Sequence, residues 1–204
     1  MTRKYERLSV EERKKEIQSA AIKLFNEKGF AKTTMENIVE NVTLSKGGVY
    51  RIYPSTTEIL KDIIIYGMHL RNRFYEEYAK KEIASGGKLT LPFIVKIIGD
   101  SLKLYPEISS VYVEFLWEKR RNPKLEELYH DICSQTIDET IALIKKYDVD
   151  NVINISPATL AQLTELMNTT IMGIHVLDIR HIIEDKKNFI CNSIAEILKN
   201  DEKE

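Results

Sequence analysis

Residues 44–60, LSKGGVYRIYPSTTEIL, place two adjacent glycines in a short apolar segment between serines that can cap helices. Ser45 is expected to begin a very short helix that contains both Gly47 and Gly48. Glycine costs about 1 kcal/mol in a helix interior relative to alanine, so a glycine pair needs a reason. One reason is a backbone that must approach a large partner closely. The alternative is that SKGG is a loop in a structural helical hairpin.

Composition predicts a globular protein of one or two domains in the cytoplasm. Of its 204 residues, 43% are hydrophobic and 30% charged, as in soluble proteins. No run approaches the ~18 apolar residues of a membrane helix, and the N-terminus lacks the apolar core of a secretory signal. Cys133 and Cys191 form no redox or metal-binding motif, which favours buried thiols in a reducing compartment.

Charge is distributed unevenly along the chain. The net charge of −1 alone argues against nucleic-acid binding. However, residues 1–53 carry 11 Lys and Arg against 7 Glu, whereas residues 54–204 carry 19 against 24 acidic residues. This asymmetry suggests a small cationic domain, 1–53, attached to an acidic one, 54–204.

Helix-capping patterns predict an all-α fold with about nine helices. The period-2 alternation of strands is absent, whereas S/T-x-x-E capping boxes start at Ser9, Thr33 and Ser55. Asn122-Pro123 and Ser156-Pro157 each place proline in a first helical turn. The expected helices cover roughly 10–28, 34–41, 45–52, 56–80, 92–104, 106–120, 123–147, 157–177 and 183–199.

The two short helices expected at 34–41 and 45–52 are joined by few residues, as in a helix-turn-helix. The second helix of this motif enters the DNA major groove. Its N-terminus here offers small residues, free amides and the cation Lys46, which suit a phosphate or base edge. Tyr50 and Arg51 are predicted to point outward, toward phosphates and bases. The glycine pair is thus explained if the partner is DNA.

Residues 20–60, AAIKLFNEKGFAKTTMENIVENVTLSKGGVYRIYPSTTEIL, resemble the DNA-binding region of the tetracycline-repressor (TetR) family. The shared pattern is an alanine pair, LF, GF, a threonine pair, S-K-G-x-hydrophobic-Y and a capped helix start. The rest of the chain matches only in helical character and length. The resemblance implies an N-terminal three-helix domain and a C-terminal ligand-binding and dimerisation domain. It also implies a homodimeric regulator, usually a repressor, released from a palindromic operator by a small molecule of unknown identity.

Carried over position by position, the resemblance places Thr33 and Thr34 near phosphates. It places six residues on the recognition helix: Ser45, Lys46, Gly47, Gly48, Tyr50 and Arg51.

Three positions depart from the family pattern. Thr43 stands where the family has a turn glycine, so either the turn differs or Asn41 is the left-handed residue. Ile52 replaces a frequent histidine or tyrosine, so one phosphate contact is expected to be missing. Thr56 replaces a usual lysine; Ser55 and Thr56 can still donate hydrogen bonds to a phosphate, but DNA affinity should depend less steeply on salt.

The N-terminal arm carries Arg3, Lys4 and Arg7. It could lie along the DNA backbone or in a minor groove, or be a disordered solubilising tail.

Aromatic residues concentrated in 91–177 predict a ligand cavity between the body helices, where helical proteins often bind ligands. The candidate lining residues are Tyr105, Tyr112, Trp117, Met167, Met172 and His175. The alternative is ordinary core packing, in which methionine is a common gap-filler.

No metal, cofactor or catalytic site is expected. His175, Asp178 and His181 are spaced i, i+3, i+6, which spreads them around a helix instead of converging them on an ion. Motifs of hydrolases, zinc proteases and phosphate-binding loops are absent. A helical scaffold or adaptor without DNA function is the main alternative to the regulator, and a helical enzyme of unknown type is another.

Apolar stripes on the last two expected helices predict a homodimer interface of four helices. The stripes are Leu160, Leu163, Met167, Ile171 and Ile174, and Phe189, Ile190, Ile194, Ile197 and Leu198. The alternative is that they pack within one chain. A ligand between the body helices is expected to swing the helix at 56–80 like a pendulum and so separate the two recognition helices.

Overall fold

The computed structural model describes residues 9–148, 153–177 and 187–201. Within these ranges the fold is all-α, as predicted, with nine α-helices, two 3-10 turns and no strand. The helices are α1 (Val10–Lys28), α2 (Met35–Val39), α3 (Lys46–Ile52), α4 (Thr56–Ala84), α5 (Leu91–Ser101), α6 (Pro106–Glu118), α7 (Pro123–Tyr147), α8 (Pro157–Val176) and α10 (Lys187–Asp201). The 3-10 turns are η1 (Phe30–Lys32) and η2 (Lys119–Arg121).

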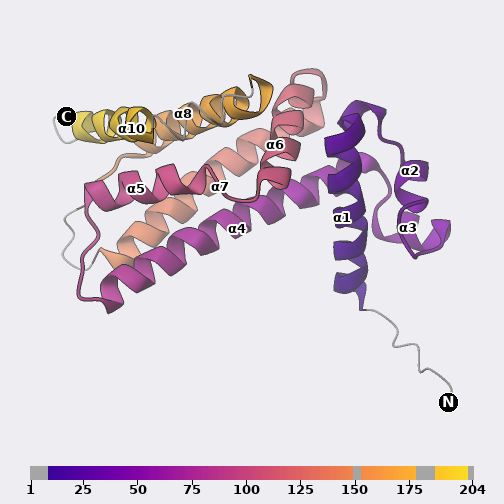
Figure 1. Ribbon diagram of the computed structural model, residues 1–204, viewed down its shortest axis with the longest axis horizontal. Coiled ribbons are helices and arrows are strands. Elements are labelled where there is room, and N and C mark those ends of the chain that lie inside the picture. The colour runs from indigo at the N-terminus through magenta and orange to yellow at the C-terminus, as the bar shows by residue number, and fades with distance from the viewer. Residues whose placement is uncertain (1–8, 149–152, 178–186, 202–204) are drawn as a thin grey trace, which may run out of the picture.

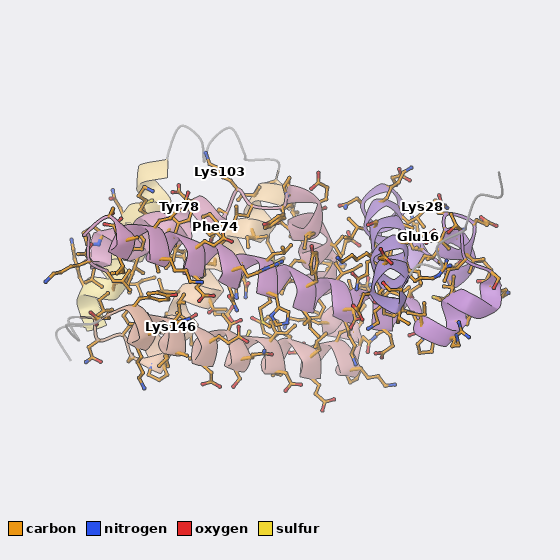
Figure 2. The ribbon with its side chains drawn as sticks, turned by 90° about the horizontal axis from the view of Figure 1, so that it is seen from below. Glu16, Lys28, Phe74, Tyr78, Lys103 and Lys146 are labelled. Carbon is orange, nitrogen blue, oxygen red and sulfur yellow. The ribbon has the colours of Figure 1, made fainter. Side chains whose placement is uncertain are left out.

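Helices α1–α3 form a small module at one end of an elongated molecule (Figure 1). Helix α4 leaves this module and runs the length of the body beside α7, while α8 and α10 form the layer farthest from α4 (Figure 1). Figure 2 shows Glu16 and Lys28 of α1 at the module end, and Phe74, Tyr78 and Lys146 toward the opposite end. One long helix therefore connects the two ends.

Side-chain caps fix most helix starts where the sequence predicts them. Ser9 and Glu12 form the expected capping box, and the Ser55 hydroxyl accepts the Glu58 amide. The second box is displaced by one residue: the N-cap is Thr34, and its partner is Asn37 instead of Glu36. This leaves the Glu36 carboxylate available for other contacts.

The largest hydrophobic cluster spans both ends of the molecule. It contains fully buried side chains of α1, α3, α4, α6 and α7, among them Phe25, Val49, Ile63, Phe115 and Leu125. A second cluster joins α5, α8 and α10. Packing therefore continues across the predicted domain boundary between residues 53 and 54, which stays a prediction.

Candidate nucleic-acid interface and ligand cavity

The two glycines of α3 have different surroundings. A Cβ on Gly48 would lie 3.3 Å from Ser45 Oγ, which accepts the Gly48 amide and caps the helix. A Cβ on Gly47 would meet nothing within 4 Å. Val49 is fully buried beneath them and anchors the helix. Internal packing therefore accounts for Gly48, but nothing in the described chain requires glycine at 47.

The outward side of α3 carries a cluster of polar groups around Glu36. Its Oε1 lies 3.1 Å from Lys46 Nζ and accepts a 3.1 Å hydrogen bond from the Tyr50 hydroxyl. Its own backbone amide, Lys46 and Tyr50 together lower the pKa of the Glu36 carboxyl. Arg51 is exposed beside them. Sequence reasoning missed Glu36 because it assigned this carboxylate to a capping box.

The two threonines predicted to lie near phosphates differ in their exposure. Thr34 is exposed at the N-terminus of α2, whereas Thr33 is 5% exposed and its hydroxyl donates to the Gly29 carbonyl at 2.9 Å. The Thr33 hydroxyl is therefore used within the chain, and DNA contact by Thr33 stays a prediction. Ser55 and Thr56 are half-buried at the start of α4. DNA contact by the remaining candidates stays a prediction.

The turn between α2 and α3 is held without a left-handed residue. Neither Asn41 nor Thr43 has positive φ; among the described residues other than glycine, only Tyr105 does. The Thr43 amide donates to the carboxylate of Glu16 on α1, and this bond lowers the pKa of Glu16. The proposal of a left-handed Asn41 is wrong, and α1 stabilises the turn.

The start of α4 is bound to α1 by a buried polar network. The Tyr53 hydroxyl donates to Asp62 Oδ2 at 2.7 Å and accepts from Gln18 Nε2 at 2.8 Å. Lys14 Nζ lies 3.6 Å from the same Asp62 oxygen. Burial and Asp62 raise the pKa of Tyr53, so the phenol remains a donor at neutral pH.

Helix α6 provides a second connection between module and body. Glu114 accepts the Phe30 amide at 3.1 Å, and Asn26 Nδ2 donates to the Glu107 carbonyl at 3.1 Å. The residue before α6, Tyr105, has φ 48° and lines a cavity among helices α4–α8. Both α4 and α6 therefore join the cavity wall to α1.

A cavity of about 210 Å³ lies among α4, α5, α6, α7 and α8. Three of the predicted residues, Tyr105, Tyr112 and Met167, line it. The other three lie outside it. Trp117 is 49% exposed, with the Arg120 guanidinium 5.3 Å from its ring, and Met172 packs against the main core. His175, near the end of α8, is the third.

None of the lining residues predicted from the sequence lies on α4 or α5. On α4 the lining comprises Ile64, Gly67, Met68, Arg71, Tyr75 and Ala79, which follow one face of the helix. The sequence signal that could have identified this wall is Arg71, a charged residue within an otherwise largely apolar stripe.

The apolar stripes of α8 and α10 pack in part within the chain. Leu160, Leu163, Ile190, Ile194 and Leu198 belong to one buried cluster. Val176, Leu177 and Phe189 remain at least 62% exposed near the facing ends of the two helices.

Some predicted features lie outside the described residues, namely Arg3, Lys4, Arg7, Asp178 and His181. In the part that is described, no group of three His, Cys, Asp or Glu residues could hold a metal. None of the described helices is long and apolar enough to span a bilayer.

Residues 17–63 match the family model described as bacterial regulatory proteins, tetR family. An uncharacterised HTH-type transcriptional regulator of Bacillus subtilis, YfiR, is 43% identical over 58 residues. This match covers 28% of each protein, so it spans little more than a quarter of that relative.

Solved structures extend the likeness to nearly the whole fold. Salmonella enterica GusR has a TM-score of 0.70 at 18% identity, covering 91% of this chain and 95% of its own. Thermus thermophilus FadR, a TetR-family repressor solved with lauroyl-CoA, has a TM-score of 0.54 at 18% identity, covering 93% and 91%. Residues 17–63 are thus similar to the N-terminal module of the tetR family of bacterial regulatory proteins, and the fold of the whole chain is similar to that of the solved structures named above.

Proposed function

We propose that the protein is a homodimeric DNA-binding transcriptional regulator, a repressor that a small ligand in the body cavity releases from a palindromic operator. The observation that carries the DNA-binding part is Gly47. It lies exposed in the first turn of α3, and no atom of the described chain occupies the space beside it. A groove-inserted helix needs such a bare backbone surface, because base edges and phosphates then approach the amides directly.

The surroundings of Gly47 support contact with a duplex. Lys46 and Arg51 are exposed on the same helix, where they can neutralise phosphates or contact bases. Buried Val49 holds the helix against the module core, so the exposed side is presented on a rigid support. Residues 1–53, which include the module, also have a positive net charge, whereas residues 54–204 have a negative one.

Dimerisation is supported by the exposed apolar residues at the facing ends of α8 and α10. Val176, Leu177 and Phe189 have no cover in a single described chain. One short recognition helix contacts few base pairs, so two copies separated by one turn of DNA, about 34–36 Å, supply affinity and specificity.

Ligand control is supported by the two helices that connect the cavity to the module. Helix α4 is bound through Tyr53 and Asp62, and α6 through Glu114 and Phe30. A ligand that fits the cavity better when these helices shift would favour a state with displaced recognition helices. Coupling of about 1–3 kcal/mol is typical of such regulators. The lauroyl-CoA complex of Thermus thermophilus FadR shows that a protein of this fold holds a small ligand.

Selection of bound fragments from random DNA tests the proposal. The full-length wild type should enrich sites with two half-sites about one helical turn apart. Gly47→Leu should weaken binding to the selected site by about a hundredfold or more, because the new side chain occupies the space left for DNA. The variant should stay folded, since leucine favours helix over glycine by roughly 1 kcal/mol.

Ala84→Leu is the matched control, because Ala84 is exposed at the distal end of α4. Its circular dichroism and DNA affinity should equal those of the wild type. If no sequence is enriched, the chain is an adaptor instead of a DNA-binding protein. If a sequence is enriched but Gly47→Leu binds it as the wild type does, the start of α3 is not the DNA-contacting surface.

A further inference from the structure

Most hydroxyl groups around the cavity are already bonded within the protein. Ser101, Thr140 and Thr164 donate to carbonyl oxygens of their own helices at 2.6–2.9 Å. The Tyr75 hydroxyl in turn donates to Ser101 Oγ at 3.0 Å. These residues therefore face the cavity mainly with carbon, despite their polar chemistry.

A second set of polar groups forms a closed chain of hydrogen bonds. Tyr112 donates to Asn168 Oδ1 at 3.0 Å, and Asn168 Nδ2 donates to the Tyr129 hydroxyl at 3.1 Å. Tyr129 donates to Glu165 Oε1 at 2.8 Å. Burial raises the pKa of both phenols, so they keep these protons at neutral pH. Both phenol donors of this chain of hydrogen bonds are therefore used within the protein.

Arg71 differs from all of these groups. One guanidinium nitrogen, Nη2, donates to Thr136 Oγ1 at 3.1 Å, but Nε is buried and has no partner. None of the ion pairs among the described residues includes Arg71. Arg71 is half-buried as a residue, but arginine stays charged in proteins and leaving its buried Nε–H without an acceptor is costly.

Arg71 is also the only charged residue among the cavity-lining residues of the described chain. The remaining wall is largely aliphatic and aromatic, and its α5 and α8 sides include Phe93, Ile94, Ile97, Ile98, Leu160 and Met167. The volume of about 210 Å³ lies below the ~300–1,000 Å³ of typical drug-sized sites. The site therefore suits a small molecule with one negative charge and an apolar tail.

We propose that the cavity binds a small amphiphilic monocarboxylate, with its carboxylate on the Arg71 guanidinium and its tail between α5 and α8. This inference rests on the proposed function, because it names the class of that regulator's ligand. A planar guanidinium binds a carboxylate through two parallel hydrogen bonds, which would satisfy Nε. A phosphate dianion or a coenzyme A nucleotide brings more negative charge than the single cation of the lining matches.

Calorimetry on the full-length protein without DNA tests the assignment, with sodium decanoate, decanol and decanoyl-CoA as probes. Wild type should bind decanoate, and Arg71→Gln should weaken this binding about tenfold or more, as expected for a charge-assisted bond. Arg71→Lys, which keeps the charge but loses the planar fork, should fall between them. Decanol, which carries no charge, should not lose affinity in Arg71→Gln.

Arg73→Gln is the matched control, since Arg73 lies on the exposed side of the same helix and outside the cavity lining. It should bind decanoate as the wild type does. A thermal melt gives an independent measure: Arg71→Met should raise the melting temperature of the ligand-free protein and abolish the further rise caused by decanoate.

The assignment is overturned if decanol binds wild type as tightly as decanoate, or if Arg71→Gln and Arg73→Gln bind decanoate equally. If decanoyl-CoA binds more tightly than decanoate, the ligand class is an acyl thioester and the proposed monocarboxylate is wrong. If decanoate binds through Arg71 but does not release the selected DNA, the ligand class stands and the proposed release mechanism fails. If the protein binds DNA but not decanoate, the ligand class fails and the regulator stands.

Discussion

The start and the middle of α4 use their polar side chains in opposite ways. At the start, Asp62 and Tyr53 bond to each other and to α1, and the phenol both donates and accepts. In the middle, Arg71 has one hydrogen bond and a buried Nε without a partner. The same helix thus has one junction whose polar groups are hydrogen-bonded, here called the saturated junction, and, about two to three turns beyond it, a site with a polar group that lacks a partner.

This difference indicates which part of α4 is rigid and which part can bind a ligand. A network whose donors and acceptors are all satisfied resists movement and can transmit a displacement between helices. A buried group that lacks a partner favours whatever ligand supplies one. The stretch of α4 that contains Arg71 therefore continues directly from the junction that bonds α4 to α1.

The largest expected effect tests whether the two regions share one core. Phe115 of α6 is fully buried and packs against Tyr112 and Tyr129, with ring centroids 5.8 and 6.5 Å away. Phe115→Ala should lower the free energy of unfolding by about 3–5 kcal/mol. Because the cluster also contains residues of α1 and α3, urea should still unfold the module and body in one transition.

Val10→Ala is the control for this change, because Val10 is 65% exposed. It should alter stability by less than about 0.5 kcal/mol. Two separate urea transitions in Phe115→Ala, followed by circular dichroism and by Trp117 fluorescence, would argue that the regions fold independently.

The saturated junction gives the next largest effect. Tyr53→Phe removes the donor to Asp62 and the acceptor of Gln18, and it leaves two partly buried groups with fewer partners. The expected loss is about 1–3 kcal/mol in chemical denaturation. Tyr50→Phe removes an exposed-side hydrogen bond to Glu36 and should cost less than about 0.5 kcal/mol. Equal losses in both variants would show that the Tyr53 junction contributes no more to stability than the exposed bond between Tyr50 and Glu36.

The smallest effect concerns a charged cluster confined to the body. Lys146, Lys80 and the Tyr147 hydroxyl lower the pKa of the Glu76 carboxyl to about 2. A carboxyl whose pKa is lower in the folded state stabilises the fold above its unfolded pKa, near 4.5, and this contribution disappears as the pH falls toward 2.

The melting temperature of wild type should therefore exceed that of Glu76→Gln at pH 7, and the gap should close between about pH 4.5 and 2. High salt should reduce the gap at pH 7, since exposed pairs are screened. Glu77→Gln, an exposed neighbour, serves as control. An unchanged gap at low pH would show that charge is not the cause.

Local patterns predicted the elements, because caps and turns depend on residues a few positions apart. Ser9, Ser45 and Ser55 start helices where expected. The exception, Thr33, differs by one residue because its hydroxyl closes a turn onto Gly29. The cap one position later uses Asn37 where the expected pattern has a glutamate.

The cavity was harder to predict because its walls come from five helices that meet only in the folded chain. Trp117 was chosen for its size, yet it lies on the outer side of α6. Arg71 was overlooked because sequence shows a charge but not the lack of a counter-ion. Whether a buried nitrogen has a partner depends on contacts between helices that are distant in sequence, such as the bond from Arg71 on α4 to Thr136 on α7.

The continuous cluster of α1, α3, α4, α6 and α7 bears on how this protein could be re-engineered as a biosensor. A chimera that joins its first 53 residues to another regulator's body would discard Ile63 and Phe115 and expose the underside of the module. A crossover within α4 beyond Met68, with α6 grafted alongside, would transplant the recognition unit together with its supporting surface.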